Sequence, residues 1–270
     1  MPELPEVETI VRGLRRRIVG KTIDRVDVRL AKMTIAPPGV EFAGAIAGER
    51  VAGVARRGKY AIVKLASGRS LVTSLRMTGR LVVSDDAGEL PAAHVVMHFA
   101  RGGRLWFSDV RTFGRMRLVA AGEAWDRDLG IEPLSSGFTH EAFIGMLSGR
   151  TTPVKALLLD QRRIAGIGNI YACEALWKAR IRPSLPSRRL TRPAIRRLRR
   201  AIVDVLKRAI EMRGTSVDDY VDADGLQGGY QNNLSVYGRD GEPCRRCRTS
   251  RIVRTVLAQR GTWWCRRCQH

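Results

Sequence analysis

Four cysteines near the C-terminal end of the chain have the type and spacing of a metal site. They form two C-x-x-C pairs, Cys244 with Cys247 and Cys265 with Cys268, within 25 residues. Thiolates held in pairs on two tight turns suit the tetrahedral coordination of Zn²⁺, and four protein ligands leave no open position for a reacting group. The pattern therefore predicts one structural zinc ion. We expect no organic cofactor. Cys173 remains as an odd thiol without an assigned role.

Basic residues surround this predicted zinc module. Arg251, Arg254 and Arg260 lie between the two pairs, so a zinc-stapled hairpin would present guanidinium groups to phosphates. The whole chain has 48 Lys and Arg against 26 Asp and Glu, a net charge of +22, which favours a polyanionic partner. No stretch approaches the ~18 apolar residues of a membrane span, and acidic residues interrupt the apolar runs that a signal peptide needs. We expect a soluble, cytoplasmic or nucleoid-associated protein that binds nucleic acid and no membrane.

A glycine-bracketed loop precedes a predicted helix in GIGNIYACEALWKA, residues 166–179. Asn169 is predicted as the N-cap of this helix, and free backbone N–H groups at a helix N-terminus can bind a phosphate. A plain corner between two helices explains the same residues. The third glycine of a dinucleotide fingerprint is absent and no strand precedes the loop, which argues against a Rossmann site.

Two turns carry apolar side chains at hairpin ends. SLRMTGRL contains Met77, and SDVRTFGRM contains Arg111 and Phe113. Apolar side chains at loop tips are costly unless they insert into a partner, and in a DNA-binding protein such wedges fill the space of a displaced base. The alternative is that Met77 and Phe113 belong to the core. Lys59 in RRGKY has the position of a solvated residue at a strand edge.

The elements that must position these residues change along the chain. Apolar residues recur at helical spacing from Pro5 to Val19, and Gly20 ends that helix. Short β-rich runs with turn signals follow to about residue 125 and predict a sandwich or flattened barrel. Helical periodicity then dominates, including a long run from Thr191 to Met212. Ten basic residues lie in or beside that run, and we interpret most of them as a solvated helix face: Arg188, Arg189, Arg192, Arg196, Arg197, Arg199, Arg200, Lys207, Arg208 and Arg213.

Taken together, these motifs resemble the formamidopyrimidine-DNA glycosylase family of base-excision repair enzymes, in its purine-directed branch. The resemblance covers essentially the whole chain, in the order PELPEVE, RRGKY, LRMTG, DVRTFG, LGIEPL, GIGNIYACEAL, VYGRDGEPC and AQRGTWWCRRC. It implies an α+β multidomain fold with DNA between domains. Residues 1–125 would form a catalytic β-sandwich with one N-terminal helix, 126–235 a helix–two-turn–helix DNA-binding domain, and 236–270 a zinc finger.

The resemblance also implies the chemistry. The nucleophile would be the amine of Pro2 after cleavage of Met1. An α-amino group has a pKa of about 8, so it is nucleophilic near neutral pH, unlike a lysine. Attack on C1′ of a damaged nucleoside expels the base and leaves an iminium ion, which permits β- and then δ-elimination. Glu3 would be the acid/base and Glu6 a supporting carboxylate, while Glu8 is interpreted as favourable charge in the first turn of the helix.

Contacts with DNA and with the lesion follow from the same resemblance. Further catalytic residues would be Lys59, near the lesion and its phosphate, and Arg260, which grips phosphates around the flipped nucleotide together with Asn169. The remaining assignments are Met77, Arg111 and Phe113 in the vacated base stack, Lys155 on DNA, and Thr215, Ser216 and Tyr230 lining the lesion pocket.

The sequence departs from the family pattern at four positions. Ser74 replaces a histidine, Val110 and Thr112 replace a proline and a basic residue, and Ile131 replaces a proline. These positions bear on wedge geometry and affinity. We expect a monomeric, bifunctional DNA glycosylase/AP lyase that excises oxidised purines (8-oxoguanine and formamidopyrimidines) from double-stranded DNA. The alternatives are an endonuclease VIII-like enzyme for oxidised pyrimidines and a non-catalytic damaged-DNA-binding protein of the same fold.

Overall fold

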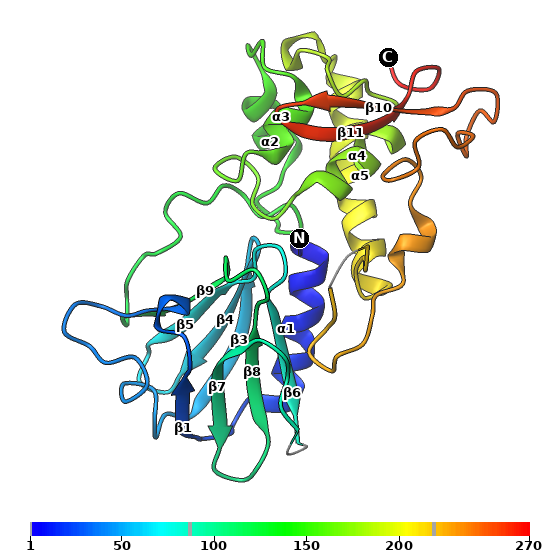
Figure 1. Ribbon diagram of the computed structural model, residues 1–270. Coiled ribbons are helices and arrows are strands. Elements are labelled where there is room, and N and C mark those ends of the chain that lie inside the picture. The colour runs from blue at the N-terminus through cyan, green and yellow to red at the C-terminus, as the bar shows by residue number, and fades with distance from the viewer. Residues whose placement is uncertain (1, 86–87, 218–219) are drawn as a thin grey trace. The chain divides into compact units, whose positions relative to one another are not determined.

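The computed structural model describes residues 2–85, 88–217 and 220–270 (Figure 1). Met1, whose cleavage the proposed chemistry requires, lies outside the described residues. The chain divides into two compact units. The first comprises Met1–Arg127 with Met212–Gly229, and the second comprises Asp128–Glu211 with Tyr230–His270. None of the helices in the described parts is long and apolar enough to cross a membrane.

The first unit combines one helix with two β-sheets, which confirms the predicted sandwich (Figure 1). One sheet has the order β1-β7-β8-β6 and the other β2-β9-β5-β4-β3; every pairing is antiparallel except that of β2 with β9. The helix is α1 (Leu4–Ile18), and the strands are β1 (Ile23–Val28), β2 (Thr34–Ile35), β3 (Val51–Arg57), β4 (Tyr60–Leu65), β5 (Ser70–Ser74), β6 (Arg80–Ser84), β7 (Ala93–Phe99), β8 (Arg104–Ser108) and β9 (Arg115–Val119), with a 3₁₀ turn at Ala31–Met33.

Helix α1 packs its apolar stripe into the core of this unit. Val7, Ile10, Val11, Leu14 and Ile18 are fully buried among inward-facing residues of both sheets. Burying each such side chain contributes about 1.5–3 kcal/mol, so packing holds this helix in place. The core therefore fixes the N-terminal end of α1, where the predicted catalytic residues Pro2 and Glu3 lie.

The segment 212–229 packs on α1 although it lies far from it in the sequence. Gly13 faces Ala223 so closely that an added Cβ would lie 2.7 Å from the Ala223 Cβ. The N–H of Val83 in β6 donates to the carbonyl of Ala223 at 2.9 Å. Thr215 and Ser216, two of the three predicted pocket residues, therefore belong to the same unit as the predicted nucleophile.

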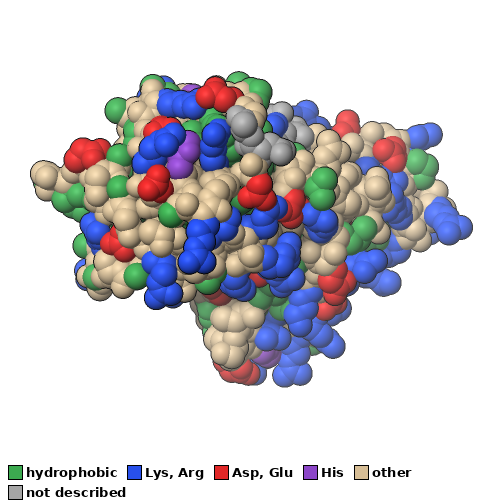
Figure 2. Space-filling model, turned by 90° about the horizontal axis from the view of Figure 1, so that it is seen from below, with side chains coloured by type: hydrophobic (Ala, Val, Ile, Leu, Met, Phe, Trp, Pro, Cys, Tyr) green, Lys and Arg blue, Asp and Glu red, His purple; other side chains and the backbone are tan. Residues whose placement is uncertain are grey.

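The second unit is helical and carries a β-hairpin. Its longest helix, α5 (Arg192–Glu211), buries an apolar stripe that includes Ile195, Leu198 and Ile202, and most of its arginines lie on the solvent side, as predicted. Basic side chains are also scattered widely over the face of the molecule drawn in Figure 2, among fewer acidic ones. The other elements are α2 (His140–Leu147), α3 (Val154–Leu159), α4 (Asn169–Lys178), β10 (Ile252–Leu257) and β11 (Arg260–Cys265), with 3₁₀ turns at Ser187–Arg189 and Tyr230–Asn233.

Candidate functional site

Two buried carboxylates stand at the start of α1, directly after Pro2. Glu3 is 2% exposed and Glu6 is 1% exposed, and Pro2 is buried beside them. Glu3 occupies the N-cap position, and its backbone N–H donates to Oε2 of Glu6 at 2.8 Å. The helix therefore begins one residue earlier than the predicted Pro5, because Glu6 stabilises its first turn from within.

The second oxygen of Glu6 binds a distant part of the chain. The backbone N–H of Thr215 donates to Oε1 of Glu6 at 2.8 Å. Gly214 has a φ of +82°, and a Cβ there would lie 2.9 Å from the same oxygen, so only glycine permits this approach. Tyr220 donates to the carbonyl of Arg213 at 3.1 Å, and burial together with the charge of Glu6 raises the pKa of Tyr220. Glu6 thus joins the N-terminus to the segment 212–229.

The segment 212–229 closes on itself around Ser216. The Ser216 hydroxyl donates to the carbonyl of Tyr220 at 2.8 Å and accepts the N–H of Gly228 at 2.9 Å. The carboxylate of Asp222 forms an ion pair with Arg213 and accepts backbone N–H groups further along the loop. The predicted pocket residues Thr215 and Ser216 are therefore held in an internally bonded loop, part of which, Asp218 and Asp219, lies outside the described residues.

Tyr230, the third predicted pocket residue, belongs to the second unit. It is buried there, with its ring centroid 5.8 Å from that of Tyr171. Burial, with the nearby charge of Glu174, raises the pKa of its hydroxyl. The structure therefore gives Tyr230 a packing role in the second unit and does not include it in the loop of Thr215 and Ser216.

Lys59 lies in a two-residue hairpin turn between β3 and β4. Arg57 pairs with Tyr60, which leaves Gly58, with a φ of +56°, and Lys59 at the tip. Arg56 anchors this turn, because its Nε donates to Oε2 of Glu8 at 3.0 Å and its Nη1 donates to the carbonyl of Gly58 at 2.9 Å. Glu8 therefore does more than place a favourable charge in the first turn of α1. Through Arg56 it also links the turn that carries Lys59 to this helix.

Met77, Arg111 and Phe113 form an exposed cluster at the ends of two hairpins. The Nη1 of Arg111 lies 3.1 Å from Sδ of Met77, and its guanidinium lies 4.9 Å from the ring centroid of Phe113. Met77 is 42% exposed and Phe113 51% exposed. The alternative that these two residues belong to the core is therefore wrong, and the predicted trio is brought together.

A buried aspartate that sequence reasoning missed organises this cluster. Asp109, directly after β8, is fully buried and accepts the N–H groups of Gly114 at 2.6 Å and Arg111 at 3.2 Å. It also accepts the Thr78 hydroxyl from the Met77 turn. The available signal was an aspartate at the end of an apolar strand. Thr112, one of the departures, adopts a positive φ of 53° at this tip, whereas the departure Val110 is simply exposed.

The second unit brings two further predicted residues, Asn169 and Lys155, to the carbonyl of Gly261. The Nδ2 of Asn169 and the Nζ of Lys155 both donate to the Gly261 carbonyl at 3.0 Å. Asn169 is the first residue of α4 and Gly168 is its N-cap, so the N-cap assignment of Asn169 is wrong; its side chain bonds to the hairpin instead. Lys155 is fully buried and also donates to the Thr262 hydroxyl at 2.6 Å, so its side chain stabilises the hairpin of β10 and β11 from the protein interior.

The hairpin tip that presents Arg260 has an unusual backbone. Leu257 pairs with Arg260, and the two residues between them, Ala258 and Gln259, have φ of +50° and +56°. A two-residue turn of this kind favours glycine or asparagine, and such strain concentrates at functional sites. The exposed Arg260 therefore directly follows a turn in which Ala258 and Gln259 adopt backbone conformations that alanine and glutamine disfavour.

The four predicted zinc ligands converge. Their Sγ atoms lie within 4.8 Å of one another, with Cys244 and Cys268 3.9 Å apart and Cys247 and Cys265 3.8 Å apart. A Zn–S bond of about 2.3 Å requires S···S edges of about 3.8 Å in a tetrahedron. The side chains therefore fit one structural zinc ion, as predicted.

Two residues of α4 connect this metal site to the helices. Cys173 packs in the same buried cluster as Cys244, Cys265 and Cys268 but is not one of the converging four. Glu174, buried beside it, accepts three backbone N–H groups at 2.9 Å each, from Ser235, Val236 and Tyr237. Burial raises the pKa of Glu174. The sequence signal for this anchor was a carboxylate on an otherwise apolar helix.

Comparisons with known proteins match the chain from end to end. Residues 1–116 match the formamidopyrimidine-DNA glycosylase N-terminal domain, 129–221 the H2TH domain of the same enzymes, and 241–270 a zinc finger found in FPG and IleRS. A formamidopyrimidine-DNA glycosylase of Pelotomaculum thermopropionicum is 45% identical over 100% of this chain and 99% of its own.

Solved structures agree with the sequence matches. The MutM (Fpg) protein from Thermus thermophilus is 40% identical, with a TM-score of 0.89 over 99% of this chain and 98% of its own. The Lactococcus lactis Fpg in complex with DNA that contains an abasic site is 35% identical, with a TM-score of 0.91 over 99% of both chains.

Proposed function

The chain belongs to the formamidopyrimidine-DNA glycosylase family, and we propose that its reaction runs through Pro2, Glu3 and the residues that hold them. It is a DNA glycosylase with AP lyase activity that acts on oxidised purines in DNA and holds one structural zinc ion. The observation that carries the residue assignment is the placement of Pro2 directly before two buried carboxylates, one of which is the N-cap of a core-anchored helix.

The proposed reaction starts at the Pro2 nitrogen once Met1 has been cleaved. The amine forms a bond to C1′ as the bond from C1′ to the damaged base breaks, and Glu3 transfers a proton to open the sugar ring. The resulting iminium ion acidifies the C2′ proton. Loss of that proton expels the 3′ phosphate, and a second elimination expels the 5′ phosphate.

Glu6 has a positioning role in this proposal. Each of its carboxylate oxygens accepts a backbone N–H, from Glu3 and from Thr215. These bonds direct both carboxylate oxygens toward backbone N–H groups, which suits a positioning role and not a proton shuttle. Thr215 and Ser216, in the loop bonded to Glu6, are the proposed contacts to the lesion.

The remaining predicted residues serve DNA binding in the same proposal. Met77, Arg111 and Phe113 fill the gap that the displaced nucleotide leaves, because they are exposed and Arg111 contacts both of the others. Lys59, Asn169 and Arg260 bind phosphates around the lesion. Lys155 acts through the Gly261 carbonyl that it shares with Asn169.

The partner is double-stranded DNA, which the net charge of +22 favours. The Lactococcus lactis relative has been solved with DNA that contains an abasic site. We propose that the enzyme works as a monomer on cytoplasmic, nucleoid DNA, with functional modules at 1–125, 126–235 and 236–270. In this division the middle module contributes its segment 212–229 to the first structural unit.

Borohydride trapping on duplex DNA with 8-oxoguanine opposite cytosine tests the proposal. Processed wild-type protein should form a covalent adduct, and Pro2→Gly should lose most of it while keeping DNA affinity. Equal trapping by Pro2→Gly would overturn the role of the N-terminal amine. A thymine glycol duplex in parallel tests the pyrimidine alternative, and binding without any trapping would identify a non-catalytic binder.

A further inference from the structure

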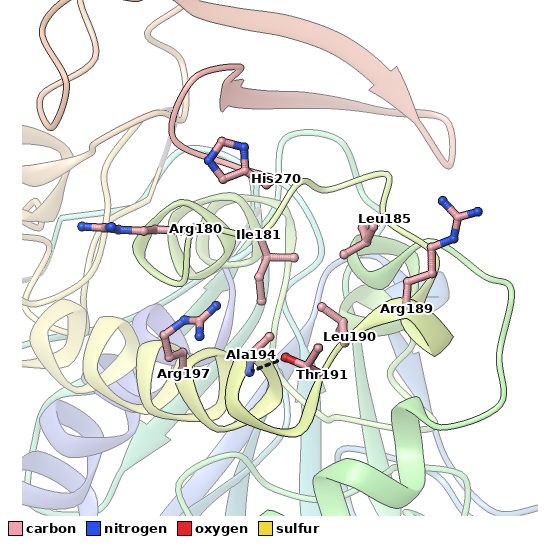
Figure 3. A pocket seen from close by; sticks show the side chains of 9 residues that line it. All are labelled: Arg180, Ile181, Leu185, Arg189, Leu190, Thr191, Ala194, Arg197 and His270. Atoms are coloured by element: carbon pink, nitrogen blue, oxygen red, sulfur yellow. Dashed lines mark hydrogen bonds between the residues drawn. The ribbon is translucent and has the colours of Figure 1, made fainter.

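A hollow of about 450 Å³ lies in the second unit, where the chain leaves α4 and enters α5 (Figure 3). The side chains of Ile181, Leu185 and Leu190 turn toward its centre, and Ala194 of α5 lies below them. Its volume is within the range of sites that hold small ligands or anchoring side chains. The floor of the hollow is therefore apolar.

Arginines flank this apolar floor. Arg180 and Arg189 extend outward on opposite sides of the hollow, and Arg197 rises from α5 on the side of Arg180 (Figure 3). All three are exposed, and no ion pair joins them to an acidic side chain in the described parts of the chain. The lining includes no Asp or Glu. The rim therefore carries the positive charge of three arginines, and His270 completes the lining.

The hollow is separate from the proposed phosphate contacts. Helix α4 and strand β11 run side by side: at one end Asn169 bonds to Gly261, and at the other Nε2 of Gln269 donates to the Ile181 carbonyl at 2.9 Å. The ten residues of α4 span about 15 Å. The hollow lies at the end of these elements that is remote from Asn169.

The backbone at Arg180 supports a use for its side chain. The residue follows the C-cap Ala179 and has a φ of +61°, a position that favours glycine. Its N–H donates to the carbonyl of Trp177 at 3.1 Å, and the next N–H, of Ile181, donates to the carbonyl of Leu176 at 3.0 Å. This geometry holds an arginine where glycine would cost less, as happens at functional sites.

We propose that this hollow binds an acidic segment of a partner protein that carries a large apolar side chain. The apolar residue would occupy the floor over Ile181 and Leu190, and the flanking carboxylates would pair with Arg180, Arg189 and Arg197. A second DNA duplex would meet the charge of the rim, but its backbone has no projecting apolar group to fill the floor. The site is independent of the glycosylase reaction.

Fluorescence anisotropy with a labelled peptide of six aspartates followed by leucine and phenylalanine tests the proposal. The full-length, zinc-loaded protein should bind this peptide at least ~10-fold more tightly than a peptide that ends in two serines. Arg197→Glu and Arg189→Glu should each weaken binding ~10-fold, whereas Lys207→Glu, which changes the charge equally on α5 outside the hollow, should change it less than 2-fold. Trapping on 8-oxoguanine DNA should stay unchanged in all three.

Arg180→Gly separates binding from folding. This substitution should raise the Tm by about 2 °C, because glycine adopts the left-handed backbone conformation at position 180 without strain. It should still weaken the binding of the peptide. The proposal would be overturned if the serine peptide bound as tightly as the peptide that ends in leucine and phenylalanine. It would also be overturned if Lys207→Glu weakened peptide binding as much as Arg189→Glu or Arg197→Glu. Unchanged peptide binding by Arg180→Gly would overturn the role of Arg180. Displacement of the peptide by an undamaged duplex from a protein already saturated with lesion DNA would identify a second DNA site instead.

Discussion

The carboxylate of Glu6 accepts the backbone N–H of Thr215 at 2.8 Å, across a separation of 209 residues in the sequence. Its other oxygen accepts the N–H of Glu3, the residue next to the proposed nucleophile. One buried side chain therefore fixes both the start of α1 and the loop proposed to contact the lesion. A displacement of either partner would be transmitted to the other through this side chain.

Replacing Glu6 with glutamine tests this coupling. The amide offers one acceptor oxygen for two backbone donors, so one buried N–H loses its partner at a cost of about 1–3 kcal/mol. We expect the single-turnover excision rate to fall ~10- to 100-fold with little change in the DNA Kd, because the proposed phosphate contacts are untouched. Glu123→Gln, at an exposed pair with Arg117 in the same unit, is the matched control. A normal rate in Glu6→Gln would remove its positioning role.

Sequence patterns could predict the parts of the site that are local. The cysteine pairs specify their own metal, and the apolar spacing of α1 specifies its buried face. The contact of Glu6 with Thr215 could not be predicted, because it depends on how a distant loop returns to α1 and on the close approach of Gly214. The role of Asp109 could not be predicted for a similar reason. An aspartate in a turn is common, and only the fold shows that two separate turns are hydrogen-bonded to this one.

Phe113 should contribute to catalysis and not to stability. Its side chain is 51% exposed, and substitutions at such surface positions change the free energy of unfolding by about 0.5 kcal/mol or less. Phe113→Ala should therefore keep the wild-type Tm but lower the excision rate from duplex DNA ~10-fold, because unstacking a base is no longer compensated. Rates on duplex DNA and thermal melting of both proteins measure this. A large loss of Tm would show that the ring is structural.

Acid should weaken the first unit in part through Asp27. Its Oδ2 lies 2.7 Å from Nε2 of His98 across the pair of β1 and β7. Burial works to raise the pKa of Asp27, but the hydrogen bond and charge of His98 and the charge of Arg25 outweigh it, so the pKa lies below its usual value.

A depressed carboxyl pKa adds stability that is present above the unfolded value of about 3.9 and is lost as the pH falls through the folded value. Asp27 is part-exposed, so screening keeps its contribution below about 1 kcal/mol. The Tm of wild type should exceed that of Asp27→Asn at pH 6, and the difference should shrink as the pH falls below about 4. A difference that stays constant as the pH is lowered further would assign the effect to packing.

Loss of the zinc ion should abolish tight DNA binding and leave the first unit folded. The hairpin that supplies the Gly261 carbonyl depends on the four thiolates, so without the metal Lys155 and Asn169 lose that acceptor and Arg260 loses its fixed turn. Cys244→Ser should bind less than one zinc per chain and raise the DNA Kd at least ~10-fold, since several phosphate contacts act together.

Cys173→Ala is the control, because Cys173 packs beside the ligands without joining them. It should retain one zinc per chain by metal analysis and a wild-type Kd; zinc loss in Cys173→Ala, or tight DNA binding by zinc-free Cys244→Ser, would contradict this account of the finger.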